Sequence, residues 1–401
     1  MKDISTDKNK IKQLLERSVA EIINKDSLAK KLQSGKILRV KLGIDPTGPR
    51  IHIGRSITLL KLKDFQELGH QVVFIVGDFT GQVGDTSDKN AERPMLSADQ
   101  IKENMVNYLE QVGQILDLGK VEVHYNSEWL EKLSFIEIAK MADAFSVHEF
   151  TNRDVIKRRI DAGSRVNMRE MLYPIMQGYD SVAIKADVEI GGTDQRFNML
   201  AGRVLTEQAK MPKQDIVMTE LINGTDGQKM STSKGNTIFI DAEPNEMFGV
   251  IMSITDEMII PYFKMLTRIP LEEVEKFEKD LVDKKNPKEI KSKLAYEMVK
   301  MYHSVKDADQ AAKEFEAVFV KKGKPEKIDE VKLEKGELLI TELLVKTSLA
   351  GSKSAAGRLV EQGGVRIDEA VIDESTAKIG VHEGMVINVG KRKWVKIKIA
   401  K

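Results

Sequence analysis

The sequence predicts an α/β protein with a parallel-sheet domain, then an α-helical domain, then a small α+β domain. Three observations indicate this fold class. Apolar, β-branched runs alternate with helical patterns in the first half of the chain, residues 245–320 are charged and helical without a convincing strand, and a lysine-rich linker precedes a compact final segment. With 401 residues and 41% apolar content, the chain can bury a full core and suggests two or three domains.

The elements of the first domain follow from the pattern along the chain. Residues 1 to about 35 are expected to form a charged amphipathic helix, and the runs 37–45 and 71–80 have the length and composition of strands. Between these strands, four apolar side chains recur at helical spacing: Ile57, Leu60, Phe65 and Leu68. A strand, helix, strand unit implies a parallel pair. Alternation resumes at 187–209 and 214–222.

Composition shifts predict the domain boundaries. The sheet domain is expected over 1–225, with an N-terminal helix and an inserted connective segment at about 120–165. The helical domain is expected over 226–325 and includes a lysine-containing loop at its start. A linker over 326–336 then leads to the α+β domain at 337–401.

Composition also excludes several kinds of site. The net charge is +1, so any basic surface for nucleic acid must be local. The chain has no cysteine, which removes disulfides, thiolate nucleophiles and cysteine-bound zinc, and no protein-bound zinc or other metal site is expected. We find no apolar run long enough for a signal core or a membrane span, so we expect a cytoplasmic protein with no membrane partner.

The loop after the first strand run has the composition of a phosphate site. In open parallel sheets, ligands bind at the carboxyl ends of strands, where helix N-termini present N–H groups. Gly43 and Gly54 allow backbone close to a ligand, and Thr47, His52 and Arg55 supply donors for phosphate oxygens. The alternative is an ordinary strand-to-helix loop in which His52 only caps or packs.

A second loop, "GQKMSTSKGN" at 227–236, has a similar character. It places Lys229 and Lys234 among serine, threonine, glycine and asparagine residues, which favour phosphate contacts and local turns. Taken alone, it could equally be a solvated loop.

A third stretch offers polar groups for a small ligand. Tyr173, Gln177 and Asp180 are spaced i, i+4 and i+7, so a helix would project them from one face. They would line a pocket, or else form the exposed polar face of a helix. Downstream, Gly192 ends an apolar run, and Asp194 follows where an aspartate can cap a helix or bind ribose hydroxyls.

Together these stretches resemble a known family. "HIGR" with "KMSTS" is similar to the paired ATP-binding motifs of class I aminoacyl-tRNA synthetases, and "YPIMQGYD" followed by "GGTDQRFN" resembles the bacterial-type tyrosyl-tRNA synthetases. The resemblance extends from Gly43 to the C-terminus. It implies a Rossmann-like catalytic domain, an anticodon-side helical domain and an S4-like RNA-binding domain.

The resemblance also implies site residues. Catalytic residues acting on the triphosphate would be Thr47, His52, Lys229 and Lys234. The ATP site would contain Gly43, Asp45, Gly54, Arg55, Gly192, Asp194, Met230, Ser231 and Thr232. The tyrosine site would contain Lys41, Thr80, Asp85, Tyr173, Gln177, Asp180 and Gln195.

Within these sites the resemblance assigns separate roles. Tyr173, Gln177 and Asp85 would hold the α-amino group of the amino acid. Asp180 would accept the hydrogen bond of the substrate phenol, and Asp194 would bind the ribose.

Three positions depart from the family pattern. Arg55 stands where the family commonly has a second histidine, and Thr232 stands where the lysine loop commonly has its second lysine. Because arginine offers phosphate donors and Lys234 lies two residues beyond Thr232, we expect altered contacts with activity retained. Lys41 stands where another branch has a tyrosine, and we expect it to pair with Asp180 or to donate to the phenol oxygen.

The implied reaction has two steps. L-tyrosine and ATP, the latter bound with Mg²⁺, would form tyrosyl-adenylate and pyrophosphate, and tyrosine would then pass to tRNA(Tyr). The first step needs positioning and charge stabilisation but no protein nucleophile. The resemblance also implies a homodimer.

The C-terminal segment contributes an RNA argument. Residues 336–401 contain 11 Lys or Arg against 8 Asp or Glu, a net charge of +3, with basic residues around Trp394. The segment is expected to be an S4-like RNA-binding module, and the alternative is a solvated basic end.

Two function classes stay open on sequence alone. The favoured class is a tyrosine-activating enzyme, with tryptophan a weaker candidate substrate because Asp180 requires a hydroxyl donor. The rival is a non-catalytic, synthetase-like RNA-binding protein, suggested by Arg55 and Thr232. Tyrosine-dependent exchange of pyrophosphate into ATP distinguishes them.

Overall fold

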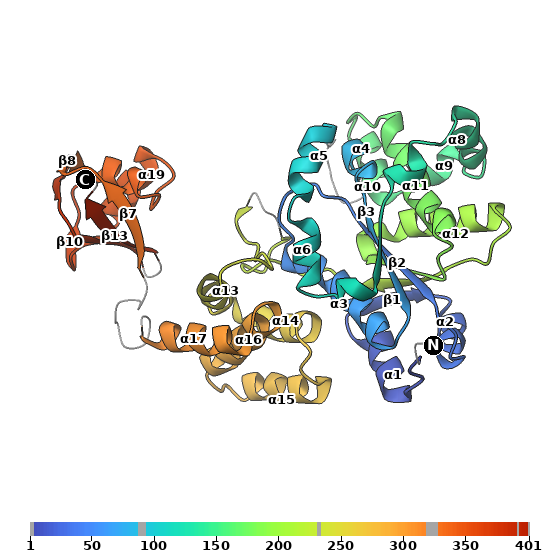
Figure 1. Cartoon of the computed structure of the whole chain (residues 1–401), viewed down its shortest axis with the longest axis horizontal. Coiled ribbons are helices and arrows are strands. Elements are labelled where there is room, and N and C mark those ends of the chain that lie inside the picture. The colour runs from blue at the N-terminus through green and yellow to red at the C-terminus, as the bar shows by residue number, and fades with distance from the viewer. Residues whose placement is uncertain (1–3, 87–93, 231–233, 318–327, 391–392, 400–401) are drawn as a thin grey trace. The chain divides into compact units, whose positions relative to one another are not determined.

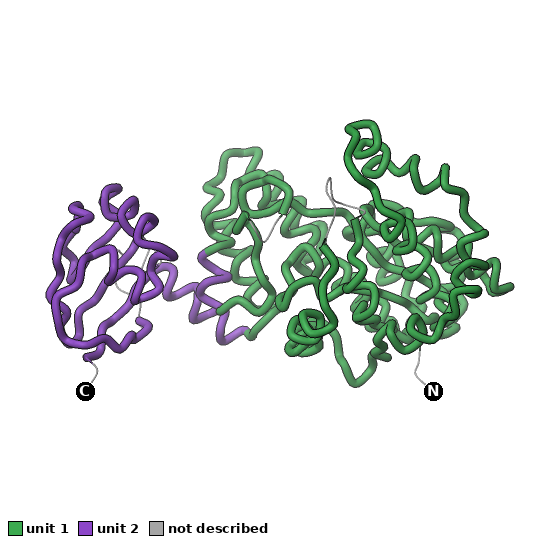
Figure 2. Tube along the Cα trace, turned by 90° about the horizontal axis from the view of Figure 1, so that it is seen from above, with its two compact units in different colours: residues 1–243, 250–304 green, residues 244–249, 305–401 purple. Residues whose placement is uncertain are grey.

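The chain folds into two compact units. The computed structural model describes residues 4–86, 94–230, 234–317, 328–390 and 393–399 (Figure 1). The first unit comprises residues 1–243 and 250–304, and the second comprises residues 244–249 and 305–401 (Figure 2).

A six-stranded sheet forms the centre of the first unit. Its strands are β1 (Val19–Ile23), β2 (Arg39–Ile44), β3 (Gln71–Val76), β4 (Val121–Tyr125), β5 (Val188–Gly192) and β6 (Asp215–Thr219). They lie in the order β1-β6-β5-β2-β3-β4, and every neighbouring pair is parallel except β1 with β6. The expected α/β sheet is therefore present, but it is mixed, not purely parallel.

The N-terminal segment differs from the single helix that its charge pattern predicts. Residues 8–33 form α1 (Lys8–Glu16), the strand β1 and α2 (Lys25–Gln33). The strand has only five residues, and Glu21 interrupts its apolar run. Its conformation is stabilised by antiparallel pairing with β6, some 200 residues away along the chain.

The predicted strand, helix, strand unit is confirmed. Between β2 and β3 lies α3 (Ile53–Glu67), which buries Ile57, Leu60 and Phe65 on one face. The sheet also continues to β4, inside the segment at 120–165 that we expected to be only connective. This edge strand is short and half-buried, which is why its pattern is weak.

Helices surround the sheet. Between β3 and β6 they are α4 (Thr80–Val83), α5 (Ala98–Met105), α6 (Tyr108–Gly113), α7 (Ser127–Leu130), α8 (Phe135–Ala142), α9 (Val147–Thr151), α10 (Asp154–Asp161), α11 (Met168–Ala183) and α12 (Arg196–Gln208), with 3₁₀ turns at Leu118–Lys120 and Thr193–Gln195. No helix in the described ranges is long and apolar enough to cross a membrane.

In the stretch expected to be helical, the described residues form helices and the turns between them, with no strand. It contains α13 (Pro244–Ile251), α14 (Ile259–Leu266), α15 (Leu271–Val282), α16 (Pro287–Tyr302) and α17 (Val305–Phe315), with a 3₁₀ turn at Asp256–Met258. Helices α14 to α16 belong to the first unit, in which α14 packs against α3 and against α15 and α16. The Tyr302 hydroxyl donates to Ser56 Oγ at 2.7 Å, and Arg17 Nη1 donates to the Thr267 carbonyl at 2.5 Å.

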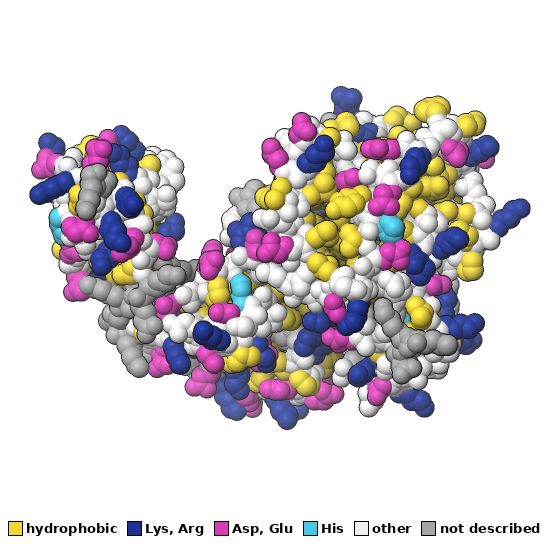
Figure 3. Space-filling view, viewed as in Figure 1, with side chains coloured by type: hydrophobic (Ala, Val, Ile, Leu, Met, Phe, Trp, Pro, Cys, Tyr) yellow, Lys and Arg dark blue, Asp and Glu magenta, His cyan; other side chains and the backbone are white. Residues whose placement is uncertain are grey.

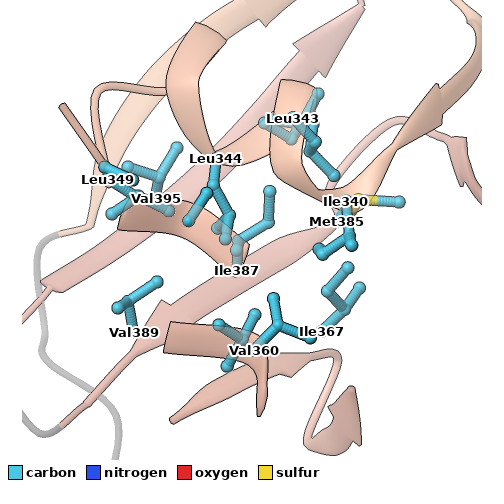
Figure 4. Packing of buried hydrophobic residues seen from close by; sticks show 14 of the residues in the cluster. Ile340, Leu343, Leu344, Leu349, Val360, Ile367, Met385, Ile387, Val389 and Val395 are labelled. Carbon is cyan, nitrogen blue, oxygen red and sulfur yellow. The ribbon is translucent and has the colours of Figure 1, made fainter. Parts of the chain in front are cut away.

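The C-terminal part of the second unit is an α+β module. Its elements are β7 (Asp329–Leu333), β8 (Gly336–Leu339), α18 (Ile340–Lys346), α19 (Lys353–Glu361), β9 (Val365–Ile367), β10 (Ala370–Ile372), β11 (Lys378–Val381), β12 (Val386–Val389) and β13 (Lys393–Ile399). The sheets have the orders β10-β9-β12-β13-β7 and β11-β8. Leu344 and Val360 from the helices meet Ile387 of β12 in a common core (Figure 4).

Strand β7 lies within residues 326–336, which the sequence assigns to a linker. This edge strand is mostly exposed, so its sequence is rich in lysine and acidic residues and lacks the apolar pattern of a strand. Parallel pairing with β13 orders it.

The strand order marks where a ligand would bind. From β2 the chain proceeds to β3 and β4 on one side, and β5 and β6 lie on the other side. In open α/β sheets, ligands bind outside the carboxyl ends of the strands at such a reversal. The boundary between β2 and β5 is therefore the expected location of a site.

Candidate active site

Polar side chains converge at the carboxyl edge of the sheet. Asp45 follows β2, Thr80 follows β3, Asn126 follows β4 and Asp194 follows β5. Because these four strands are parallel, their carboxyl ends lie along one edge. We call the group formed by Asp45, Thr80, Asn126, Tyr173 and Asp180 the edge cluster.

Hydrogen bonds connect the two carboxylates of the edge cluster. Asp45 accepts from the Thr80 hydroxyl at 2.7 Å and from the Tyr173 hydroxyl at 2.7 Å. The Thr80 oxygen in turn accepts from Asn126 Nδ2 at 2.9 Å, and the same nitrogen lies 3.5 Å from Asp180 Oδ2. A single polar network therefore spans the loops after β2, β3 and β4 and the helix α11.

A glycine makes room for this network. A Cβ on Gly77, directly after β3, would lie 2.0 Å from Asp45 Oδ1 and 2.5 Å from Thr80 Oγ1. Because neither oxygen can move without breaking their mutual hydrogen bond, a larger residue at 77 would break the network.

Burial shifts the pKa values of the edge cluster. Burial raises the pKa of Asp180 to about 7, although the charge of Lys41 and a hydrogen bond from Trp129 Nε1, at 2.8 Å, act in the opposite direction. Burial likewise raises the pKa of Asp45 to about 6 against the hydrogen bonds from Thr80 and Tyr173. Burial and the nearby Asp45 also raise the pKa of Tyr173, so its hydroxyl keeps its proton.

Lys41 does not pair with Asp180. Its ammonium group is fully buried and donates to the Gln177 carbonyl at 2.9 Å and to Ser181 Oγ at 2.8 Å, and it forms an ion pair with Glu189 at 3.0 Å. The expected pairing of Lys41 with Asp180 is therefore wrong, and the ammonium group already has three acceptors within the protein. The reason is register, since Lys41 of β2 lies directly opposite Glu189 of β5.

Amide side chains extend the site from the edge cluster. Gln195 Nε2 donates to Asp85 Oδ2 at 2.7 Å. Asn198 Nδ2 donates to Gln195 Oε1 at 3.0 Å and to Gln177 Oε1 at 3.1 Å. Four side chains from the loop after β3, the turn after β5, α11 and α12 therefore share one set of hydrogen bonds.

The helix α11 confirms the predicted spacing. Tyr173, Gln177 and Asp180 lie on this one helix, and each has polar partners within the site. Sequence reasoning gave no role to Asn198, although it lies in the quoted "GGTDQRFN", or to Asn126 and Trp129. No local pattern points to the last two, because they reach Asp180 only through the pairing of β3 with β4.

Arg55 braces the loop after β2. Its Nη1 donates to the Asp45 carbonyl at 3.0 Å and lies 2.9 Å from the Tyr108 hydroxyl, and its Nη2 donates to Thr47 Oγ1 at 2.9 Å. The sequence suggested Arg55 as a phosphate donor and did not single out Tyr108. In the structure, two of the guanidinium nitrogens hold Thr47 and the backbone beside it.

His52 is a neutral imidazole in which one buried ring nitrogen has no partner among the described residues. Burial, with a contribution from the charge of Arg55, lowers its pKa to about 4. It occupies the N-cap position of α3, yet its side chain makes no capping hydrogen bond. Its Nδ1 is buried and finds no partner among the described residues. The capping alternative is therefore not what the structure shows.

The lysine loop lies against the start of α3. Residues 51–53 and 238–240 run antiparallel, with Ile53 N donating to the Ile238 carbonyl at 2.9 Å and Ile240 N donating to the Ile51 carbonyl at 3.0 Å. Met230 Sδ lies 3.2 Å from where a Cβ on Gly54 would be. The two motifs, nearly 180 residues apart in sequence, are neighbours.

The other residues predicted for the ATP site lie at strand ends or in the lysine loop. Gly43 lies near the end of β2, and Gly192 ends β5, where its lack of a Cβ leaves space for the Asp194 carboxylate. Lys229 and Lys234 are exposed. Ser231 and Thr232 lie outside the described residues. Within the described ranges, no group of three His, Asp or Glu side chains is placed to hold a metal ion.

Comparison with known families agrees with this geometry. The family described as "tRNA synthetases class I (W and Y)" matches residues 6–320. Tyrosine-tRNA ligase of Shewanella oneidensis is 44% identical over 385 residues, covering 96% of this chain and 97% of the relative. The ligase of the same name from Thermotoga maritima is 42% identical over 387 residues, covering 96% of each chain.

Solved structures share the fold. A C-terminally truncated mitochondrial tyrosyl-tRNA synthetase of Aspergillus nidulans superposes with a TM-score of 0.66 at 22% identity, covering 78% of this chain and 95% of that chain. A tyrosyl-tRNA synthetase of Archaeoglobus fulgidus, complexed with L-tyrosine, gives a TM-score of 0.60 at 22% identity, covering 76% of this chain and 99% of that chain.

The raised pKa of Asp180 predicts a pH-dependent stability difference. A carboxyl whose folded-state pKa is raised stabilises the fold at low pH, and this contribution is lost as the pH rises toward 7. Asp180→Asn removes the titration. Urea unfolding should show the natural chain losing about 3 kcal/mol relative to this variant between pH 5 and pH 8. Asp283→Asn, at an exposed aspartate, is the control. A constant difference for Asp180→Asn would contradict the burial argument.

Proposed function

Because the chain belongs to the bacterial tyrosyl-tRNA synthetases, within the class I tRNA synthetases for tryptophan and tyrosine, we propose that the edge cluster and the neighbouring loops are its active site. The reaction joins L-tyrosine to tRNA in two steps, with ATP consumed in the first. One observation supports this location above others: Met230 of the lysine loop lies beside Gly54 of "HIGR", and Arg55 of the same segment bonds to the Asp45 carbonyl and to Thr47 near the sheet reversal.

Asp180 is the proposed acceptor for the substrate phenol. It is 3% exposed and already accepts from Trp129, so its remaining acceptor capacity is directed into the site. Phenylalanine would leave this buried group without its hydroxyl partner, which is more costly than the loss of the contact itself. Tryptophan offers no hydroxyl in its place.

The substrate ammonium is proposed to lie between Asp85, Tyr173 and Gln177. Gln195 and Asn198 hold Asp85 and Gln177 through one hydrogen-bonded set. Asp45 lies beside Tyr173 and adds negative charge once it is ionised. These groups match an ammonium cation better than a neutral or anionic group.

Adenylate formation then needs no protein nucleophile. The tyrosine carboxylate attacks the α-phosphorus of ATP, a bond to that phosphorus forms, and pyrophosphate leaves with the bonding electrons. Thr47, His52, Lys229 and Lys234 would donate to the phosphate oxygens. Neutral His52 serves as an N–H donor. Mg²⁺ is proposed to enter with ATP, and Asp194 to bind its ribose.

We propose the same domain roles as the sequence suggested. Residues 1–225 would be catalytic, 226–325 would form the anticodon side, and 337–401 would be an S4-like RNA-binding domain. Lys332 and Lys335, at and just after β7, and Lys346 of α18 line a hollow of about 410 Å³ in the α+β module, and β13 exposes further lysines. Such a surface suits the phosphates of folded RNA. Since the reaction uses ATP and tRNA, we also propose a cytoplasmic location.

An apolar surface supports a homodimer. Phe135 is 87% exposed, and Ile136, Val147, Met168 and Leu172 are exposed as well. Nearby, a hollow of about 240 Å³ is lined mainly by apolar side chains, including Leu133 and Ile138 beside Phe135 in sequence. Figure 3 shows apolar side chains gathered on one face of the first unit. A protruding ring next to a hollow on one surface fits a twofold interface.

Pyrophosphate exchange tests the reaction. We expect purified protein with Mg²⁺ to exchange labelled pyrophosphate into ATP when L-tyrosine is present, and far more slowly with phenylalanine or tryptophan. Gly77→Ala should lower kcat/KM for tyrosine at least tenfold because it displaces Asp45 and Thr80. Gly249→Ala is a control, since a Cβ there meets nothing within 4 Å. Absence of tyrosine-dependent exchange would favour the non-catalytic RNA-binding alternative.

The pKa of Asp45 predicts the pH profile. Protonation below about pH 6 removes negative charge beside the substrate ammonium, so kcat/KM for tyrosine should fall toward tenfold per pH unit as the pH drops below that value. The exchange assay between pH 5 and pH 8.5 measures this. Asp45→Asn should be less active and should lose the limb near pH 6. Retention of that limb in the variant would assign it to another group.

The dimer proposal predicts that a charge placed in the apolar surface converts the protein to a monomer. Phe135→Asp places a charge in the apolar surface and should shift the sedimentation coefficient at micromolar concentration from that of a dimer to that of a monomer. Val282→Asp, on α15 at 77% exposure, is the matched control and should stay dimeric. Equal behaviour of the two variants would argue against this surface.

A further inference from the structure

A continuous run of hydrogen bonds leads from the core of the sheet to the proposed ammonium site. Its members, in order, are Lys41, Glu189, Gln177, Asn198, Gln195 and Asp85. Lys41 and Glu189 lie side by side in mid-strand, with side chains 0% and 2% exposed. We call these six residues the amide relay.

The buried ion pair determines the orientation of the Gln177 amide, and Asp85 favours the same sense at the other end of the amide relay. An ammonium group can only donate and an ionised carboxylate can only accept. Glu189 Oε1 lies 3.0 Å from Lys41 Nζ and accepts from Gln177 Nε2 at 3.2 Å. The Gln177 amide nitrogen is thus committed to Glu189, and its oxygen must face the other way.

The remaining amides follow from that first choice. Gln177 Oε1 accepts from Asn198 Nδ2, which also donates to Gln195 Oε1, and Gln195 Nε2 then donates to Asp85. Turning Gln177 over would place its carbonyl oxygen against the Glu189 carboxylate and its NH₂ group against that of Asn198. Both contacts would be repulsive.

Further hydrogen bonds hold the two charged groups of the ion pair in their positions. Glu189 Oε2 accepts from Ser181 Oγ at 3.2 Å and from Gln214 Nε2, while Lys41 also donates to Ser181 and to the Gln177 carbonyl. Buried ion pairs are often no more stabilising than apolar residues of the same volume. Fold stability is therefore a weak explanation for this pair.

We propose that Lys41 and Glu189 are positioning residues for recognition of the substrate's α-amino group. They hold Gln177 with its acceptor oxygen, and not its NH₂ group, available to an ammonium cation. Lys41 thus serves the amino end of the substrate through Gln177 and has no contact with the phenol. This inference rests on the proposed function, because it assumes that tyrosine binds at Gln177.

The test removes both charges while keeping the volume. The double variant Lys41→Met with Glu189→Gln leaves no unpaired buried charge, and the new Gln side chain can donate to Gln177 Oε1 and so permit the reversed amide. In pyrophosphate exchange, KM for L-tyrosine should rise at least tenfold, while KM for ATP changes less than twofold.

A ligand without the amino group isolates the effect. Inhibition by 3-(4-hydroxyphenyl)propanoate, which is tyrosine lacking its α-amino group, should weaken less than twofold in the double variant. A general distortion of the site would weaken tyrosine and this analogue equally, and that result would overturn the proposal. An unchanged KM for tyrosine would overturn it too.

Two further variants complete the design. Lys31→Met with Asp215→Asn removes an ion pair of 2.9 Å between α2 and β6, outside the amide relay, and should leave both KM values within twofold. Ser181→Ala keeps both charges and removes the hydroxyl that bridges them. It should raise KM for tyrosine two- to fivefold, and it decides the question if the double variant does not fold. Lack of exchange by the natural chain would instead refute the proposed function.

Discussion

Two carboxylates at the carboxyl edge of the sheet, the half-buried Asp45 and the buried Asp180, impose the constraint on which the site depends. Each must find hydrogen-bond donors, because a buried carboxylate without partners is costly. The donors come from separate elements: Thr80 after β3, Tyr173 on α11 and Trp129 on α7. Satisfying the two carboxylates therefore helps to fix the relative positions of these loops and of α11, which also approach one another around an apolar hollow. The same burial raises both pKa values toward neutrality, so the groups that organise the site also respond to pH near the working range.

The cationic side chains near the proposed phosphate site differ in how far they are exposed to solvent. Arg55 is committed to the loop backbone and to Thr47, whereas Lys229 and Lys234 are exposed in a loop that reaches the start of α3. Between them stands His52, kept neutral by burial and by the charge of Arg55. A neutral imidazole donates to a phosphate oxygen without adding charge before the substrate arrives. In the proposed site the lysine loop would supply most of the positive charge for the triphosphate, because Arg55, in place of the second histidine of the family, is already bonded to Thr47 and to the Asp45 carbonyl.

The sequence was most informative where local chemistry decides the structure. The spacing of Tyr173, Gln177 and Asp180 predicted one helix face, and the apolar period of 57–68 predicted α3; both are confirmed. Strands β1, β4 and β7 were not predicted, because short edge strands depend on partners far away in sequence. Lys41 was assigned the wrong partner for a related reason: the choice between Asp180 and Glu189 depends on the register of β2 against β5. Asn126 and Trp129 act on Asp180 only because β4 lies beside β3. The roles given to Ser231 and Thr232, which lie outside the described residues, and to the exposed lysines stay predictions.

The register of β2 against β5 places Lys41 opposite Glu189, and the resulting ion pair can orient a side-chain amide beside it. Side-chain amides have two ends of nearly identical shape, so packing alone cannot decide which end faces a ligand. A carboxylate decides it, since it accepts only amide hydrogens, and a buried carboxylate in turn needs a cation such as Lys41. A cation in the proposed substrate site would repel an ammonium group, whereas Lys41 in the core is separated from the proposed ammonium site by Glu189 and Gln177. In this proposal, recognition of the substrate ammonium depends on a buried ion pair behind Gln177. Burying the two charges is costly, but the carboxylate leaves only one favourable orientation for the amide.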